Sequence, residues 1–346
     1  MTAKPLTVAF LYNVRHTYPD PADPRTQLET DFDDPATIEA MIAHLEHCGY
    51  EVIPIEADRA AYLALHRLRE RIDVAFNYAE GIYGHDRECH LPAMLEMLQI
   101  PYTGSTPLTQ ALVLHKAKAK DLLGAHGVPV LPHQVFRSAD EPLAPGLGFP
   151  LIVKPLAQGS SAGITNKSVV EDDAALRAQL AAVLDTFGGQ AFVEPFVDGR
   201  EFSIGMLGAA DGGAPTVLPW IEPNHAALPE GYHKIDSLEV KWVFEEQAGG
   251  SDYLRCPPEV PQRLKARIDA ICLAVWDTLE MRDFCRIDLR CDRDGNPYVL
   301  EVNSPAGLIP PAISTTSYFP LACRTAGLDY EAMLQRIIAS ALARPR

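Results

Sequence analysis

Two carboxylates, a carboxamide and an arginine lie at alternating positions near the end of the chain. Arg286 and Asp288 are two residues apart, as are Glu301 and Asn303, and alternate residues of a strand share one face of a sheet. A turn at Gly295 would pair the two strands as an antiparallel hairpin and bring Asp288 near Glu301. Hard oxygen ligands of this kind suit Mg²⁺, and Arg286 beside them could hold a developing oxyanion. A solvated sheet face with cross-strand ion pairs is the competing interpretation.

A glycine- and serine-rich loop at residues 158–163 follows a predicted strand that carries Lys154. Small residues let backbone N–H groups approach a phosphate closely, and a lysine supplies a point charge. Because the lysine precedes the glycines, the segment matches neither the P-loop nor the dinucleotide-binding glycine pattern. It predicts a phosphate site of another kind, with a serine-rich hairpin turn as the alternative.

Three further charged residues are candidates for nucleotide binding. Glu194 and Glu201 flank a predicted chain reversal, where Glu201 could accept hydrogen bonds from a ribose and Glu194 one from an adenine amino group. A surface turn explains these two residues equally well. Lys116 lies in a lysine-rich helical segment, for which a solvated helix face is the alternative.

The composition excludes several classes of protein. Hydrophobic residues make up 47% of the 346 residues and charged ones 22%, which is typical of globular rather than disordered or collagen-like chains. Thirty Lys and Arg against 46 Asp and Glu give a net charge of −16, and so acidic a surface repels nucleic acids and anionic membranes. No apolar run approaches the ~20 residues of a membrane helix. The seven scattered cysteines contain no C-x-x-C pair, so we expect a cytoplasmic protein with reduced thiols, without a disulfide framework or a zinc site.

The chain length favours two or three packed units, because one hydrophobic core rarely serves so many residues. We expect them at residues 1–108, 109–197 and 198–346. The first alternates strands and helices, which favours a small doubly wound parallel sheet. Ligands of such sheets bind at the carboxyl ends of the strands, here near residues 12–16 and 77–81, for which ordinary loops are the alternative.

The hydrophobic patterning assigns elements within these units. The predicted strands lie at residues 6–12, 51–55, 71–77, 150–155, 191–194, 285–292 and 297–302. The predicted helices lie at residues 34–47, 109–126, 172–187 and 261–279. A long polar insert occupies residues 222–255.

The order of the motifs resembles that of the ATP-grasp superfamily, and within it the D-alanine–D-alanine ligases. The likeness extends from Asn77 onward and rests on five segments: residues 100–120 with Lys116 and Lys120, residues 149–163, residues 194–201, residues 238–241, and the hairpin with Arg286, Asp288, Glu301 and Asn303. It implies an α/β fold, α+β in the ATP-binding part. That is an ATP-grasp fold with an N-terminal doubly wound parallel-sheet domain, the pre-ATP-grasp domain.

The resemblance also implies cofactors and residue roles. The cofactors are ATP and Mg²⁺ (or Mn²⁺), with Asp288, Glu301 and Asn303 as metal ligands. The implied catalytic residues are Arg286, Ser160 and Lys241, the last on a mobile loop. The residues implied in nucleotide binding are Lys116, Lys154, Gly159, Ser160, Ser161, Glu194, Phe196, Val197, Glu201, Lys241 and Leu300. Relatives are commonly homodimers, so we expect a homodimer.

In the implied mechanism, a substrate carboxylate attacks the γ-phosphate of ATP and gives an acyl phosphate and ADP. An amine then attacks the acyl phosphate, and a tetrahedral intermediate expels phosphate. Because water would hydrolyse the acyl phosphate, we expect the insert at residues 222–255 to close as a lid.

The sequence departs from D-alanine–D-alanine ligases where substrate identity is set. Residues 12–19 replace the family's glycine-rich turn, and only Glu29 and Asp31 lie near the place of the glutamate that binds the first D-alanine's ammonium. Trp242 replaces the lid tyrosine, and the segment after the metal-binding asparagine, residues 304–317, is longer. Residues 76–88 resemble a divergent branch of the family. Together these departures indicate that the ATP-binding residues are kept and that the substrate-binding residues differ.

The leading hypothesis is therefore an ATP- and Mg²⁺-dependent ligase that forms an amide between small amino-acid-like substrates. The alternatives are D-alanine–D-alanine ligase itself and a nucleotide-binding protein without turnover, which has little need of Arg286. A zinc hydrolase using His225 and His233 is the weakest, because their spacing fits no metal motif.

Overall fold

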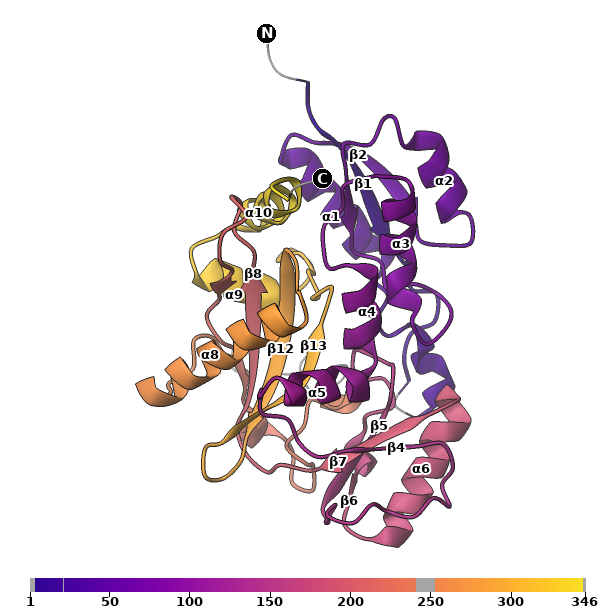
Figure 1. Cartoon of the computed structure of the whole chain (residues 1–346), viewed down its shortest axis with the longest axis vertical. Helices are drawn as coiled ribbons and strands as arrows, with labels where there is room; N and C mark the ends of the chain where they lie inside the picture. Colours follow the sequence, from indigo (N-terminus) through magenta and orange to yellow (C-terminus); the bar gives the residue numbers. More distant parts are fainter. Residues whose placement is uncertain (1–3, 21, 241–252, 345–346) are drawn as a thin grey trace.

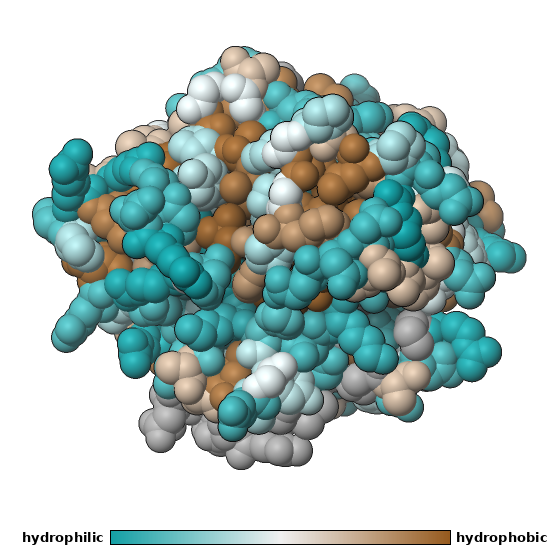
Figure 2. All heavy atoms as spheres, turned by 90° about the horizontal axis from the view of Figure 1, so that it is seen from below, coloured by the Kyte–Doolittle hydropathy of each residue, from teal (hydrophilic) through white to brown (hydrophobic). Residues whose placement is uncertain are grey.

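The computed structural model describes residues 4–20, 22–240 and 253–344. Their strands form one three-stranded sheet, two four-stranded sheets and one two-stranded sheet. Figure 1 shows the N-terminal sheet at the top, the sheet that contains the hairpin at the centre and the remaining four-stranded sheet at the bottom. Hydrophilic side chains cover most of the face drawn in Figure 2. Within the described ranges, no helix has both the length and the apolar composition to cross a membrane.

The N-terminal sheet is parallel, as predicted, with strand order β2-β1-β3. The central strand β1 (Thr7–Tyr12) pairs with β2 (Glu51–Glu56) on one side and with β3 (Val74–Asn77) on the other. All of β1 except its last residue is buried. A strand covered on both faces is apolar throughout rather than alternating, which explains why this run resembles a core segment.

Helices flank this sheet. Its predicted helix, α1 (Pro35–His47), begins directly after Asp34 and has proline at its first position, where the missing N–H has no partner to lose. The other helical elements of this part are the 3₁₀ helices η1 (Pro24–Glu29) and η2 (Arg87–Cys89) and the helices α2 (Ala61–Leu68) and α3 (His90–Met97).

The single helix predicted over residues 109–126 is wrong. The chain forms two helices, α4 (Pro107–Leu114) and α5 (Lys116–Ala125), which are separated at His115. The backbone of His115 is not helical, with ψ at 86°, and its Nδ1 accepts a hydrogen bond from the N–H of Lys118. The helical spacing of apolar residues continues from α4 into α5 and so hides the break at His115. This spacing carries no information on whether a backbone carbonyl or a side chain accepts from the first N–H groups of α5.

The second sheet is antiparallel and has the order β4-β7-β5-β6. Its strands are β4 (Gln134–Phe136), β5 (Leu151–Pro155), β6 (Val169–Val170) and β7 (Ala191–Pro195). The 3₁₀ helix η3 (Asn166–Ser168) precedes β6, and α6 (Asp173–Phe187) packs its apolar side on the sheet. The Asp172 carboxylate caps α6 by accepting a hydrogen bond from the N–H of Ala175 at 2.8 Å, at the predicted helix start.

The third sheet contains the predicted hairpin and has the order β13-β12-β8-β9. Its strands are β8 (Glu201–Leu207), β9 (Thr216–Val217), β12 (Phe284–Cys291) and β13 (Pro297–Asn303), and α8 (Gln262–Thr278) packs against it. The polar insert leaves this part through β10 (Glu222–Pro223) and the 3₁₀ helix η4 (His225–Ala227) and returns through β11 (Leu254–Arg255). Because Glu222 pairs with Arg255, the two ends of the insert meet.

The last two helices join the third sheet to the first. In Figure 1, α10 (Tyr330–Leu342) lies beside α1, and α9 (Tyr318–Thr325) lies against β8. One hydrophobic cluster contains Phe10 and Phe76 of the N-terminal sheet together with Phe319, Met333 and Ile337 of these helices. The buried contact fixes the N-terminal sheet relative to the hairpin, so residues from both reach a common cavity.

Gly199, in the turn between β7 and β8, lies against the end of β12. A Cβ at Gly199 would lie 1.9 Å from the carbonyl oxygen of Cys291, a backbone atom that has little freedom to move. We expect Gly199→Ala to lower the free energy of unfolding by about 1–3 kcal/mol, measured by urea unfolding. A Cβ at Gly148 would meet no heavy atom within 4 Å, and its φ is not positive, so Gly148→Ala should leave stability within about 1 kcal/mol of the parent. Equal stability of the two variants would contradict the expected clash.

Candidate active site

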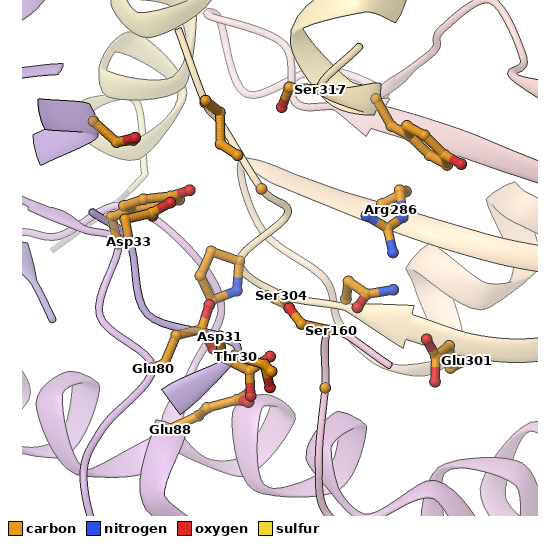
Figure 3. A pocket seen from close by; sticks show the side chains of 18 of the residues that line it. Thr30, Asp31, Asp33, Glu80, Glu88, Ser160, Arg286, Glu301, Ser304 and Ser317 are labelled. Carbon is orange, nitrogen blue, oxygen red and sulfur yellow. The ribbon is translucent and has the colours of Figure 1, made fainter. Parts of the chain in front are cut away.

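Two cavities meet at the hairpin. The larger, of about 570 Å³, lies between the N-terminal part, residues 158–160 and the segment that follows β13. The smaller, of about 60 Å³, is lined by residues of the second and third sheets. Arg286 and Glu301 line both cavities, and Figure 3 shows them together on one side of the larger one.

The hairpin has the predicted antiparallel register. Asp288 pairs directly with Glu301, and Arg286 pairs with Asn303. The buried Asp288 carboxylate accepts hydrogen bonds from Nε and Nη2 of Arg286 at 3.0 and 2.9 Å, from Ser203 Oγ at 2.6 Å and from Asn303 Nδ2 at 2.9 Å. Burial opposes the charge of Arg286, but Asp288 outweighs it and raises the pKa of the guanidinium above its ordinary value. Arg286 is therefore a permanent cation between the two cavities.

The hairpin residues fit a divalent cation that prefers oxygen ligands. Two carboxylates and a carboxamide lie on neighbouring strands, and carboxylate and amide oxygens are the ligands that Mg²⁺ takes in nucleotide sites. A carboxylate offers about four lone-pair sites, and those of Asp288 are taken by Arg286, Ser203 and Asn303. A metal ion bound at Asp288 therefore has to replace at least one of these donors.

Glu194 lies buried between two lysines. Lys120 Nζ and Lys154 Nζ donate to its two carboxylate oxygens at 2.6 and 3.0 Å. Burial alone would raise the pKa of Glu194, but the two ammonium groups outweigh it and lower the pKa below its ordinary value. The Glu194 carboxylate therefore positions both lysines, a role that the sequence analysis did not predict beside the expected contact with adenine.

Lys116 connects the loop at residues 158–163 with the hairpin. Its Nζ donates to the carbonyl oxygen of Gln158 at 2.5 Å and lies 3.5 Å from Glu301 Oε2. The side chain is buried, which excludes the solvated helix face that the lysine-rich segment also allowed. The helix break at His115 lies directly before this lysine and separates it from α4.

The glycine- and serine-rich loop has the backbone that its composition permits. Ser160 and Ser161 have φ values of 45° and 61°, in the left-handed region that non-glycine residues rarely adopt. A Cβ at Gly159 would lie 2.6 Å from Asp31 Oδ1, so the loop lies directly against the N-terminal part. Ser160 lines the larger cavity and Ser161 the smaller one.

The residues that the sequence assigned to the nucleotide or to the metal are divided between the two cavities. Those that line the smaller cavity are Lys154, Ser161, Glu194, Phe196, Val197, Glu201, Leu300 and Asp288. Those that line the larger cavity are Lys116, Gly159, Ser160 and Asn303. Lys241, and with it Trp242, lies outside the described residues.

Two buried cations beside the smaller cavity received no role in the sequence analysis: Lys120, which was named only within the segment that resembles the family, and Arg290. Lys120 follows Lys116 by one helical turn, a spacing that places both on one helix face. Arg290 continues the alternation of Arg286 and Asp288, and its Nη2 lies 3.2 Å from Glu201 Oε2 while its guanidinium lies 5.2 Å from the ring centre of Phe196. Burial raises the pKa of Glu201, and Arg290 opposes this rise without cancelling it. In both cases the spacing from a residue already assigned to the site, four along a helix or two along a strand, could have indicated the cation.

The insert contacts the smaller cavity through Asp236. The carbonyl oxygen of Asp236 accepts a hydrogen bond from Ser161 Oγ at 2.6 Å, and its carboxylate contacts His225 Nε2 at 3.1 Å and the Tyr318 hydroxyl at 3.0 Å. Ligand pockets commonly have about 300–1,000 Å³, so the smaller cavity must widen before it holds a nucleotide. Residues 235 and 236 of the insert line this cavity.

The larger cavity contains one of the two acidic residues that the sequence placed near the substrate. The Glu29 carboxylate instead accepts hydrogen bonds from the N–H groups of His16 and Thr17 at 2.6 and 2.8 Å and so fixes the loop after β1. Asp31 lines the cavity and forms an ion pair with Arg87 at 3.1 Å. The long segment at residues 304–317 supplies much of the opposite wall.

Comparisons with known proteins found matches over more than half of the chain. A family model described as "D-ala D-ala ligase C-terminus" matches residues 122–339. The protein y4sG of Sinorhizobium fredii is 33% identical over 327 residues, which cover 93% of this chain and 90% of that protein. A D-alanine–D-alanine ligase of Geobacter sulfurreducens is 32% identical over 87% of each chain. The crystal structure of D-alanine–D-alanine ligase from Bacillus anthracis complexed with ATP has a TM-score of 0.71 and 25% identity over 97% of both chains.

Proposed function

Because this chain belongs to the D-alanine–D-alanine ligase family, we propose that it joins two small amino-acid-like substrates through an amide bond, using ATP and Mg²⁺. The chain is an enzyme of the carbon–nitrogen ligase class, and its fold is that of the family. The observation that carries the proposal is that Arg286 and Glu301 line both cavities. A nucleotide in one cavity and a carboxylate in the other would meet at these two residues.

We assign the smaller cavity to ATP. Phe196, Val197 and Leu300 offer apolar contacts to a base, and Glu201 can accept hydrogen bonds from a ribose. Lys154 and Lys116, with the N–H groups near Gly159 and Ser160, would hold the phosphates. The B. anthracis structure in complex with ATP supports this assignment through the shared fold.

We assign the larger cavity to the two amino-acid-like substrates. Arg286 attracts the carboxylate of the first substrate and directs an oxygen of it toward the γ-phosphate. Attack on phosphorus gives an acyl phosphate and ADP, and the amine of the second substrate then attacks the acyl carbon. Arg286 stabilises the oxyanion of the tetrahedral intermediate, which collapses and expels phosphate.

The metal and the lid complete the proposal. Mg²⁺ (or Mn²⁺) held by Asp288, Glu301 and Asn303 would neutralise charge on the transferred phosphoryl group. The insert at residues 222–255, whose ends meet at Glu222 and Arg255, would close over the site and exclude water, with Lys241 brought to the phosphates. We further propose a cytoplasmic homodimer whose subunit divides at residues 108 and 197.

D-alanine–D-alanine ligase is the second candidate function. Relatives that carry this name, such as the G. sulfurreducens enzyme, favour it. The acidic segment at residues 31–34 and the long segment at residues 304–317 favour a different product, because both border the cavity assigned to the substrates.

Product detection by mass spectrometry tests the proposal. The protein is incubated with ATP and Mg²⁺, first with D-alanine alone and then with a pool of D- and L-amino acids. We expect ADP release that depends on the amino acids, together with a new amide. D-alanyl-D-alanine as the main product would establish the second candidate, and a protein that binds ATP but yields neither amide nor ADP with any pool would refute ligation.

A further inference from the structure

One wall of the larger cavity carries three carboxylates, those of Asp31, Glu80 and Glu88, which we call the acidic wall. Asp31 precedes α1, Glu80 follows β3, and Glu88 lies in η2. Figure 3 shows the three on the side of the cavity opposite Arg286 and Glu301, with Ser160 between the two sides. An amino acid in this cavity therefore lies between the acidic wall and the guanidinium of Arg286.

Two of the three carboxylates have no partner among the described residues. Glu88 is 8% exposed and lines the cavity, and its side chain forms no hydrogen bond with any residue that the structure describes. The side chain of Glu80 likewise has no hydrogen-bond or ion-pair partner within the described part of the chain. Buried carboxylates are normally paired, because an unpaired buried charge is costly.

The cations beside the acidic wall are already engaged. Arg87 donates to Asp31 Oδ2 at 3.1 Å and to the carbonyl oxygen of Ala157 at 2.9 Å. Lys116 attracts Glu88 only from a distance, since it binds Gln158 and lies beside Glu301. When all three carboxylates are ionised, the single guanidinium leaves the wall with two negative charges.

The remaining carboxylates of the cavity have local partners. Asp34 forms an ion pair with Arg15 at 3.4 Å, and Asp33 accepts a hydrogen bond from Tyr78. Glu80 and Glu88 differ from them in a second respect. Burial raises the pKa of Glu88 to about 8 and that of Glu80 above its ordinary value, and the carboxylates of the wall reinforce the rise in both. A ligand with positive charge therefore stabilises the ionised form of these two carboxylates.

The position of the acidic wall identifies the substrate that it serves. Asp31 Oδ1 lies against the loop at Gly159, next to Ser160, so the wall borders the loop assigned to the phosphates. A substrate held here has its cationic end toward Glu80 and Glu88 and its carboxylate toward Arg286. That substrate is the one whose carboxylate is phosphorylated.

We propose that the phosphorylated substrate is an amino acid with a second cationic group on its side chain, a diamino acid such as ornithine or lysine. With both carboxylates ionised, the α-ammonium of a neutral amino acid would balance only one of the two negative charges, whereas a second ammonium group would balance the other. The cavity of about 570 Å³ has room for such a side chain, since it equals roughly 19 times the liquid volume of one water molecule. This inference rests on the proposed ligase function.

The test compares ornithine with norleucine, which has a side chain of the same length that ends in a methyl group. Both enantiomers of each are assayed with ATP, Mg²⁺ and a mixed amine pool for ADP release and amide formation. We expect kcat/KM for ornithine to exceed that for norleucine at least tenfold. Glu88→Gln should lower the value for ornithine at least tenfold and leave norleucine nearly unchanged, because only the charge is removed. The control is Glu39→Gln, an exposed carboxylate on α1, which should match the parent protein.

A binding measurement separates failure of the inference from failure of the proposed function. Isothermal titration calorimetry with a non-hydrolysable ATP analogue compares ornithine and norleucine on the parent protein and on Glu88→Gln. Tighter binding of ornithine that is lost in Glu88→Gln supports the inference, even for a protein that forms no amide. Amide formation with equal use of both amino acids would overturn the inference and leave ligation intact. Equal binding of both without turnover would overturn both.

Discussion

Arg286→Ala is expected to reduce the rate of ADP release and amide formation by about 10³-fold or more while ATP binding changes little. Removal of a single donor to a developing oxyanion commonly lowers kcat by about 10²–10³, and Arg286 supplies a full charge as well as hydrogen bonds. Arg286 lines both cavities and is 16% exposed at its side chain, so it can reach reacting atoms from either side. The measurement is steady-state kinetics together with titration of a fluorescent ATP analogue.

Two further variants identify the cause of the loss. Arg286→Lys keeps a positive charge but not the paired hydrogen bonds to Asp288, so we expect it to recover a small part of the rate. Arg263→Ala removes an exposed arginine of α8 and should match the parent protein. A normal rate for Arg286→Ala, with the protein folded, would remove Arg286 from the mechanism.

Glu194→Gln is expected to lower the free energy of unfolding by about 3–5 kcal/mol, the usual cost of breaking a buried ion pair from one side. Glu194 and Lys120 have side-chain exposures of 1% and 2%, so water cannot replace the lost charge. The substitution leaves two ammonium groups facing one neutral amide. Urea unfolding followed by tryptophan fluorescence measures the change, with Glu171→Gln, an exposed carboxylate after β6, as the control within about 0.5 kcal/mol of the parent.

A double variant isolates the electrostatic part of this effect. Lys120→Met in the Glu194→Gln background removes one of the two uncompensated charges at similar volume, so it should restore part of the lost stability. If the double variant is no more stable than Glu194→Gln alone, the cost comes from repacking rather than from charge. Unchanged stability of Glu194→Gln itself would show that the two lysines do not depend on this carboxylate.

Much of the chemistry was predictable because it is encoded locally. The hairpin register follows from the alternation of Arg286 and Asp288 on one strand and of Glu301 and Asn303 on the next. The start of α1 after Asp34 and that of α6 after Asp172 follow from capping chemistry. The same local rules failed between α4 and α5, because the ring of His115 competes with the helix for a backbone N–H.

The lining of the larger cavity was not predictable from residue order. Glu29 and Asp31 are two residues apart, yet one holds backbone N–H groups of a loop and the other faces the cavity. Glu88 comes from a stretch whose sequence showed only that it diverges from relatives. The neighbouring Arg87 forms its ion pair with Asp31 and not with Glu88. The spacing of these residues along the chain does not indicate that choice.

Residue types and their spacing were sufficient to predict the family and the register of the hairpin, because these depend on motifs within one loop or one pair of adjacent strands. Tertiary packing determines which carboxylates have a partner in the protein and which do not. Lys120 reaches Glu194 across 74 residues, and Asp31, Glu80 and Glu88 meet only when the N-terminal sheet packs beside the loop at Gly159. Burial and pairing depend on neighbours brought together by packing, so the charge of the larger cavity is a property of the folded chain.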